Sequence, residues 1–173
     1  AWTEDFSHAR NISLSKATGD WVLILDADET ISSRDHGRLR ELIRANPERA
    51  DGYDLTTRNY VHASNTSGWT ANDGCYAAEE AGTGWYPNRK VRLFRNDPRI
   101  RFSGAVHELV EGSMTDAGLK IAACDVPVHH TGKLERASVL EKGESYYRIG
   151  VKKIGETGGT PRSVLELAIQ AGE

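Results

Sequence analysis

The residues best suited to catalysis or metal binding are two aspartates, Asp26 and Asp28. They are separated by one residue and directly follow an apolar run. The run, residues 21–25 (WVLIL), is too short for a typical helix and predicts a strand buried on both faces. Ligands of open α/β sheets collect beyond the carboxyl ends of strands, where paired carboxylates repel each other unless a cation or a shared proton intervenes. A divalent metal that holds a phosphorylated ligand resolves this repulsion. The simpler alternative is a turn after the strand.

The composition is that of an ordinary globular chain, with 173 residues, 38% of them apolar and 27% charged. This length suits one domain with a sizeable core. The formal net charge of -3 gives no global basic field that would attract nucleic acid, and no apolar run is long enough to cross a bilayer. The two cysteines, Cys75 and Cys124, lack metal-ligand spacing and predict reduced thiols in a cytoplasmic protein.

The elements around the two aspartates follow from hydrophobic periodicity. A helix capped by Asp5 or Ser7 precedes the strand and carries Arg10 and Asn11 side by side. A second helix follows the aspartates and ends at residue 44. Residues 52–61 and 90–95 alternate as strands do, whereas residues 62–84 show no clear period. So long a connection is usually functional or mobile, a description that acceptor-binding loops fit.

Further titratable residues lie in the second half of the chain. Residues 105–109 (AVHEL) predict a strand that carries Glu108, and residues 119–128 predict another, closed by His129 and His130. Helical spacing then appears over residues 134–154 and again over residues 163–171.

Six motifs occur in a fixed order along about 125 residues: FSHARN, ATGDW, LDADE, NRKVRLFR, FSGAVHE and PVHHTG. This order resembles family 2 glycosyltransferases of the GT-A fold, and most of all the bacterial lipopolysaccharide-core-type and tetratricopeptide-linked members. The resemblance implies an α/β fold with a mixed, mostly parallel sheet flanked by helices. It also implies a glycosyltransferase domain over residues 1–132 and a helical appendage over residues 133–173, similar to the start of a tetratricopeptide repeat.

Family members begin with a nucleotide-binding strand and loop upstream of the FSHARN motif. In this sequence the motif stands at residues 6–11, without that strand and loop before it. We therefore expect the chain to be an amino-terminally truncated fragment.

The resemblance also assigns roles to individual residues. It implies that Asp28 and His130 bind a divalent metal, Mn²⁺ or Mg²⁺. It places Arg10, Asn11 and Asp26 at the nucleotide-sugar donor.

Glu108 falls near the position of the family's general base. The implied chemistry is an inverting transfer, in which this base takes a proton from an acceptor hydroxyl while the nucleoside diphosphate leaves. The acceptor would be a glycan, a lipid-linked molecule or a protein of the cell envelope. The expected location is the cytoplasm, including the inner face of the membrane.

Two other classes of protein share parts of this pattern. Residues 22–30 also match the first motif of haloacid-dehalogenase-like phosphatases, in which Asp26 would be the nucleophile, Asp28 the acid/base and Thr30 their neighbour. A strand that opens the domain is typical of such phosphatases, yet here a helix precedes it. The third alternative is a non-catalytic module that binds a sugar or a protein.

Overall fold

The computed structural model describes residues 4–62, 64–65, 67–104, 106–134 and 136–157, together with positions 159, 164 and 167. Its elements in chain order are α1 (Phe6–Leu14), β1 (Trp21–Leu23), β2 (Glu29–Thr30), the 3₁₀ turn η1 (Ser33–Asp35), α2 (His36–Ala45), β3 (Gly52–Val61), β4 (Thr70–Ala71), β5 (Gly84–Arg95), α3 (Glu111–Asp116), β6 (Ile121–His130) and α4 (Arg136–Thr157).

The six strands form one mixed sheet with the order β1-β5-β3-β6-β2, and β4 pairs with β5 outside this path. Only β3 and β6 pair in parallel, and the other pairs are antiparallel. The prediction of a mostly parallel sheet is therefore wrong. A parallel neighbour needs a crossover connection, but the described residues between β3 and β5 contain no helix, so β5 returns beside β3 in the opposite direction.

Strand β1 is shorter than predicted and lies at the end of this strand order. The apolar run does meet apolar groups on both faces, since Trp21 and Leu25 pack against one core cluster and Val22 and Ile24 against another. Leu23, however, is 41% exposed, so the run is not buried along its whole length.

The predicted strand at residues 52–61 coincides with β3, whereas β5 starts at Gly84, well before the predicted residue 90. The intervening residues, expected to be irregular, contain the short strand β4. Residues 106–109, the described part of the predicted strand at 105–109, form no strand and hold only an isolated bridge from Leu109 to Ser103. Glu108 is therefore carried by a loop.

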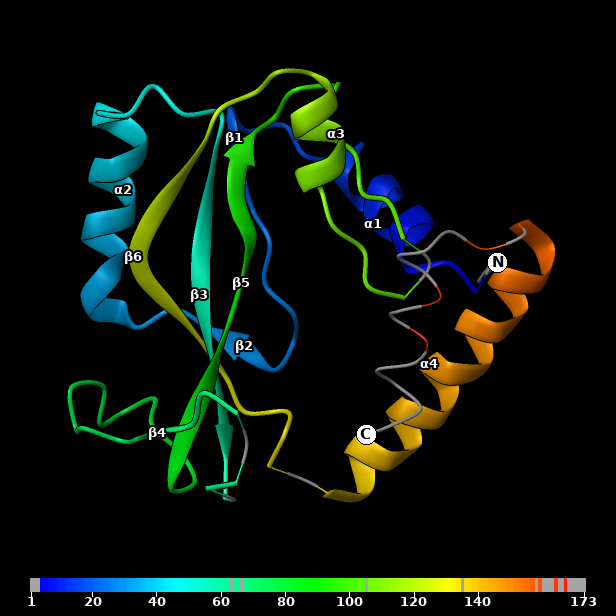
Figure 1. Ribbon diagram of the computed structural model, residues 1–173. Coiled ribbons are helices and arrows are strands. Elements are labelled where there is room, and N and C mark those ends of the chain that lie inside the picture. Colours follow the sequence, from blue (N-terminus) through cyan, green and yellow to red (C-terminus); the bar gives the residue numbers. More distant parts are fainter. Residues whose placement is uncertain are drawn as a thin grey trace.

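Two apolar clusters pack on the sheet. Helix α2 contributes Leu39 to the first, and the second receives Leu14 from α1 and Met114 from α3. Figure 1 accordingly shows α2 on one side of the sheet and α1 with α3 on the other. The caps agree with the sequence: Asp5 accepts a hydrogen bond from the backbone N–H of His8 at the start of α1.

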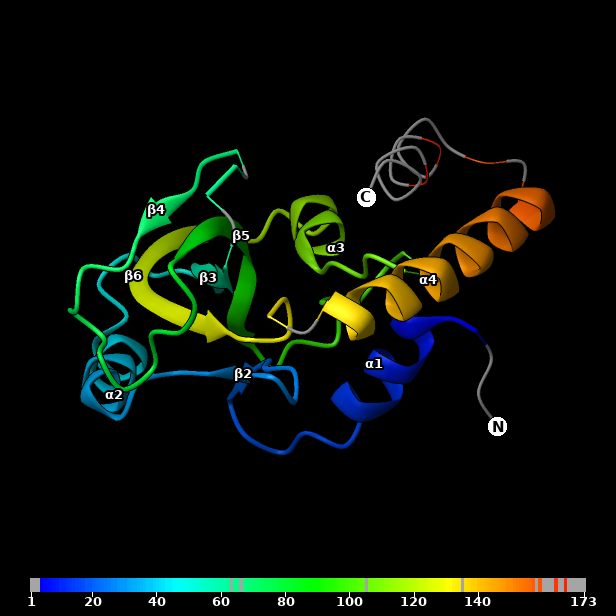
Figure 2. The ribbon, with the colours of Figure 1, turned by 90° about the horizontal axis from the view of Figure 1, so that it is seen from below.

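Helix α4, which matches the predicted helix over residues 134–154, lies beside α1 in both ribbon views (Figures 1 and 2). The Phe6 and Tyr146 rings meet edge to face, with centroids 5.5 Å apart. The second predicted helix, over residues 163–171, falls almost entirely outside the described residues. The division into a domain and a helical appendage stays a prediction.

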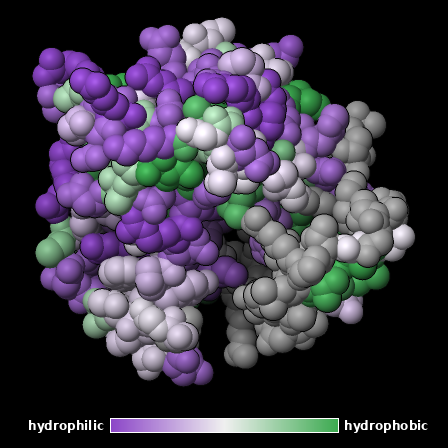
Figure 3. Space-filling view, turned by 45° about the horizontal axis from the view of Figure 1, so that its top comes forward, coloured by the Kyte–Doolittle hydropathy of each residue, from purple (hydrophilic) through white to green (hydrophobic). Residues whose placement is uncertain are grey.

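On the face that Figure 3 shows, hydrophilic residues surround small hydrophobic patches across the coloured part of the surface. Among the helices that the structure describes, none combines the length and the apolar character that a membrane crossing requires.

One buried ion pair ties the sheet to the segment that carries the two aspartates. Arg92 of β5 bonds both carboxylate oxygens of Glu29, and the side chains are only 2% and 4% exposed. The same guanidinium donates to the Thr57 hydroxyl at 3.3 Å. Because both charges are buried, each depends on the other for compensation.

We expect the substitution Arg92→Met to lower the free energy of unfolding by about 3–5 kcal/mol, because it leaves the Glu29 carboxylate buried without its partner. Urea unfolding would measure this loss. The matched control is Arg44→Met, which breaks the exposed pair of Arg44 and Glu41 and should leave stability near that of the unsubstituted protein. Equal effects of the two substitutions would contradict the structural role of Arg92.

Candidate active site

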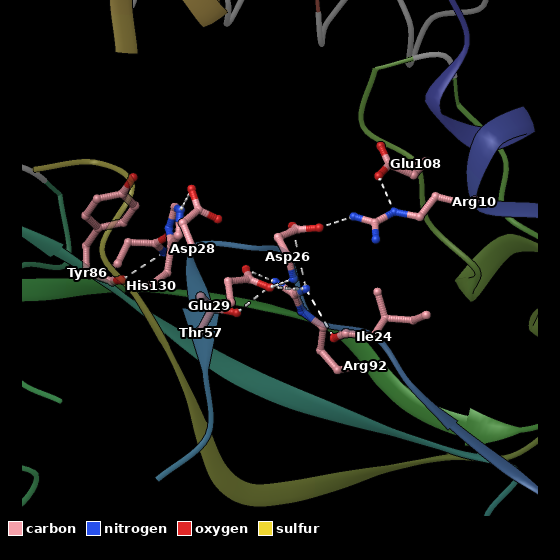
Figure 4. Close-up of polar contacts among 11 residues, drawn as sticks. Arg10, Ile24, Asp26, Asp28, Glu29, Thr57, Tyr86, Arg92, Glu108 and His130 are labelled. Atoms are coloured by element: carbon pink, nitrogen blue, oxygen red, sulfur yellow. Dashed lines mark hydrogen bonds and ion pairs between the residues drawn. The ribbon is translucent and has the colours of Figure 1, made fainter. Parts of the chain in front are cut away.

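The acidic segment, residues 26–29, turns sharply after β1 and leads into β2. The backbone N–H of Glu29 donates to the carbonyl of Asp26 at 3.0 Å, and the Glu29 carboxylate accepts from the backbone N–H of Asp26 at 2.9 Å. Glu29, which is paired with Arg92, thus also holds the backbone of Asp26. Figure 4 shows Asp26 toward Arg10 and Asp28 beside His130.

Arg10 of α1 joins two of the predicted site residues. Its guanidinium donates through Nη2 to Asp26 and through Nε to Glu108 Oε1, the latter at 3.0 Å. Burial raises the pKa of Asp26, but the hydrogen bond and charge of Arg10, with the charge of Lys90 nearby, outweigh burial and hold that pKa below its usual value. The fold thus brings together residues that are up to 98 positions apart.

Asn11 shapes the loop that carries Glu108. Its side-chain amide donates to the carbonyl of Phe102 and accepts from the backbone N–H of the same residue, both at 2.9 Å. Gly104 then turns the chain with a φ of 106°, where a side chain would crowd the His107 carbonyl. Asn11 therefore acts on the loop backbone, and its predicted contact with a nucleotide stays a prediction.

At the other end of the acidic segment, Asp28 Oδ2 lies 3.4 Å from His130 Nε2. His130 Nδ1 lies 2.7 Å from the Asn59 side-chain oxygen. An amide oxygen only accepts, so Nδ1 carries the proton and donates it to Asn59. A charged imidazole donates from Nε2 to the Asp28 carboxylate, whereas a neutral one turns its Nε2 lone pair toward it. In the neutral form two electron-rich atoms face each other, an arrangement that a metal ion between them stabilises.

The pair of Asp28 and His130 fits a divalent cation in its chemistry. A carboxylate oxygen and a neutral imidazole nitrogen are both ligands of Mn²⁺, and the hydrogen bond that Nδ1 donates to Asn59 fixes the ring as in known metal sites. Among the described residues there is no group of three or more metal-ligating side chains. The protein would therefore supply part of the coordination sphere, with the remaining ligands from substrate and water, which is usual for Mg²⁺ beside phosphates.

His129, the neighbour of His130, does not belong to this site. It is fully buried, its Nδ1 lies 2.8 Å from the Tyr60 hydroxyl, and its ring contacts that of Tyr76. Burial lowers its pKa. Of the two adjacent histidines, only His130 lies against the acidic segment.

Three functional neighbours were not predicted from the sequence: Arg92, Asn59 and Gly132. Arg92 belongs to an alternating run that indicates a half-buried strand, in which an arginine normally faces solvent. Asn59 is likewise one polar residue in a strand. Only their partners, far away in the chain, reveal what they do.

Residues 1–107 match the family described as glycosyl transferase family 2. The match covers more than half of the chain, so the chain belongs to this family, which implies the GT-A fold. The predicted resemblance is confirmed. Glu108 and His130 lie beyond the matched residues, so their assignment depends on the geometry described above.

Two relatives share this region. A TPR repeat-containing protein of Synechococcus elongatus is 35% identical over 114 residues, which is 65% of this chain and 23% of that protein. The SPbeta prophage-derived glycosyltransferase SunS of Bacillus subtilis is 27% identical over 107 residues, which is 62% of this chain and 21% of SunS. The chain thus spans between a fifth and a quarter of the length of these relatives.

Gly132 leaves the space that Asp28 and His130 occupy, because a Cβ atom there would overlap Asp28 Oδ2 and lie 2.8 Å from His130 Nε2. We expect Gly132→Ala to weaken Mn²⁺ binding about 10- to 100-fold, the range typical for disturbed support of metal ligands. Calorimetric titration with MnCl₂ would measure it. The control is Gly37→Ala, since a Cβ atom at Gly37 meets no atom within 4 Å. Unchanged Mn²⁺ affinity in the Gly132 variant would rule out a metal at this pair.

Proposed function

We propose that the protein transfers a sugar from a nucleotide-sugar donor to a hydroxyl of an acceptor, with Mn²⁺ or Mg²⁺ as cofactor. The observation that carries this proposal is the arrangement of the acidic segment in a family 2 chain, with Asp28 beside His130 and Asp26 joined to Glu108 through Arg10. The candidate metal ligands and the candidate base stand at opposite ends of one segment (Figure 4). A donor that lies along the segment would therefore have its diphosphate at one end and its reacting carbon toward the other.

In this proposal Asp28 and His130 hold the metal, which when bound neutralises charge on the diphosphate. Asp26 and Arg10 border the donor. The Glu108 carboxylate takes the proton of the acceptor hydroxyl as that oxygen forms a bond to the anomeric carbon. The bond between the anomeric carbon and the phosphate oxygen breaks, and its electron pair leaves with the nucleoside diphosphate. The sugar configuration inverts.

Arg10 sets the starting state of Glu108. Because its guanidinium bonds Asp26 and Glu108 together, the proposed base is held 3.0 Å from a cation and its side chain is only 15% exposed. An acceptor hydroxyl must approach the remaining accessible part of this carboxylate. Arg10 therefore orients the base, and the loop fixed by Asn11 gives that base its place.

The family assignment favours transfer over the phosphatase interpretation. A phosphatase needs Asp26 as a nucleophile with access to phosphorus, whereas here that carboxylate is bonded to Arg10. We also propose that the acceptor is a glycan, a lipid-linked molecule or a protein. The chain would belong with the tetratricopeptide-linked enzymes of the family. The non-catalytic alternative would keep donor binding without transfer.

The test combines binding and turnover. Mn²⁺ with a matching nucleoside diphosphate should raise the melting temperature, and Asp28→Ala should abolish that shift. Glu108→Gln should keep the shift but lower donor turnover about 10²- to 10⁴-fold, the range of a lost general base. The control is Asp125→Ala, because that carboxylate is 85% exposed and pairs with Arg38 of α2.

Three results would contradict the proposal. No shift with any of the common nucleoside diphosphates would exclude a donor site. A shift with no donor turnover would favour the binding module. Hydrolysis of a generic phosphomonoester that is lost in Asp26→Asn would favour the phosphatase.

A further inference from the structure

The NRKVRLFR motif forms the last eight of the twelve residues of β5, and Arg92 is not its only residue near the site. In the register of β3 and β5, Lys90 stands opposite Leu55, Asn88 opposite Thr57, and Tyr86 opposite Asn59. Directly opposed residues of an antiparallel pair project to the same face of a sheet.

The face in question is the one that carries the acidic segment. Thr57 accepts from Arg92, which holds Glu29, and Asn59 holds His130. Figure 4 shows Tyr86 near His130 and Arg92 below Asp26. Lys90 lies between Tyr86 and Arg92 on β5, and the charges of Asp26, Glu29 and Glu108 act on its ammonium group. Its side chain therefore lies in the same site.

The position of Lys90 is electrostatically unusual. It is half-buried, and burial with the nearby charge of Arg92 lowers its pKa, while three carboxylates, those of Glu29, Asp26 and Glu108, act in the opposite direction. Its ammonium group forms no hydrogen bond or direct ion pair within the described residues, whereas Arg10 and Arg92 nearby each bond carboxylates.

The formal charges around the acidic segment show which ligand such a lysine suits. Four carboxylates (Asp26, Asp28, Glu29 and Glu108) stand against three cations (Arg10, Lys90 and Arg92), if His130 is neutral. A divalent metal and the two negative charges of a donor diphosphate cancel each other. When the sugar leaves, the diphosphate gains a further negative charge, and a cation with unused donors beside it is stabilising at that moment.

We propose that the Lys90 ammonium group binds the diphosphate of the nucleotide-sugar donor and stabilises the departing nucleoside diphosphate. This inference rests on the proposed glycosyl transfer. Lys90 has three N–H donors and no acceptor, so its only favourable ligands are anionic or oxygen-rich groups. The carboxylates near it are already bonded to arginines, which leaves the ammonium group for a ligand.

The test is calorimetric titration of the protein in Mn²⁺ with ADP, CDP, GDP, UDP and dTDP, followed by the matching nucleoside monophosphate for each one that binds. Lys90→Met should weaken the diphosphate about 10- to 100-fold, as expected for a lost charge-assisted hydrogen bond. The monophosphate should lose much less. Lys90→Arg, which keeps the charge, should retain most of the affinity. The control is Lys120→Met, since Lys120 pairs with Glu48 on the exposed surface.

The outcomes separate this inference from the function on which it rests. If the unsubstituted protein binds no nucleoside diphosphate, the proposed function fails and the role of Lys90 fails with it. If it binds one and Lys90→Met binds it equally well, only the role of Lys90 is overturned. Equal weakening of diphosphate and monophosphate, or no rescue by Lys90→Arg, would show that Lys90 merely balances the carboxylates around it.

Discussion

The structure around the candidate site depends on one electrostatic constraint: three acidic side chains lie within four residues of chain, and each needs a partner that offsets its charge. Glu29 is buried on Arg92, and Asp26 is bonded to Arg10, which also takes Glu108 from the opposite loop. Asp28 faces an imidazole where its neighbours face guanidinium groups. The protein thus provides its own cations at two positions and an imidazole nitrogen at the third.

This constraint explains why the elements of the fold meet where they do. Strand β5 runs under the acidic segment and supplies its buried arginine, while β3 and β6 supply the amide and imidazole that face Asp28. Helix α1, which lies on the side of the sheet opposite to α2, places Arg10 against Asp26 and Glu108. The next residue of α1, Asn11, fixes the loop that carries the candidate base. Three strands and one helix therefore converge on four residues.

The candidate residues of the site could be selected from the sequence because they occur in short local patterns. Asp26 and Asp28 follow an apolar strand, and Glu108 and His130 belong to motifs whose order is itself specific. The sheet direction could not be predicted in this way, because pairing depends on whether a connection contains a crossover helix. The residues between β3 and β5 give no periodic signal on that point.

The roles of Arg92 and Asn11 were also beyond local patterns. In the sequence, Arg92 looks like any solvent-facing position of an alternating strand. It is buried together with Glu29, which lies 63 positions away in the chain. Asn11 contacts a backbone 91 positions away. The tertiary structure brings such pairs together, and the local spacing of residues in the sequence does not reveal them.

The central claim is that Asp28 and His130 share a metal ion. Electron spin echo spectroscopy of the Mn²⁺-loaded protein tests it directly, because an imidazole nitrogen bound to Mn²⁺ modulates the echo at characteristic ¹⁴N frequencies. The account predicts this modulation in the unsubstituted protein and in His8→Gln, an exposed control, and its loss in His130→Gln. Bound Mn²⁺ without nitrogen modulation, or modulation that persists in His130→Gln, would contradict the account.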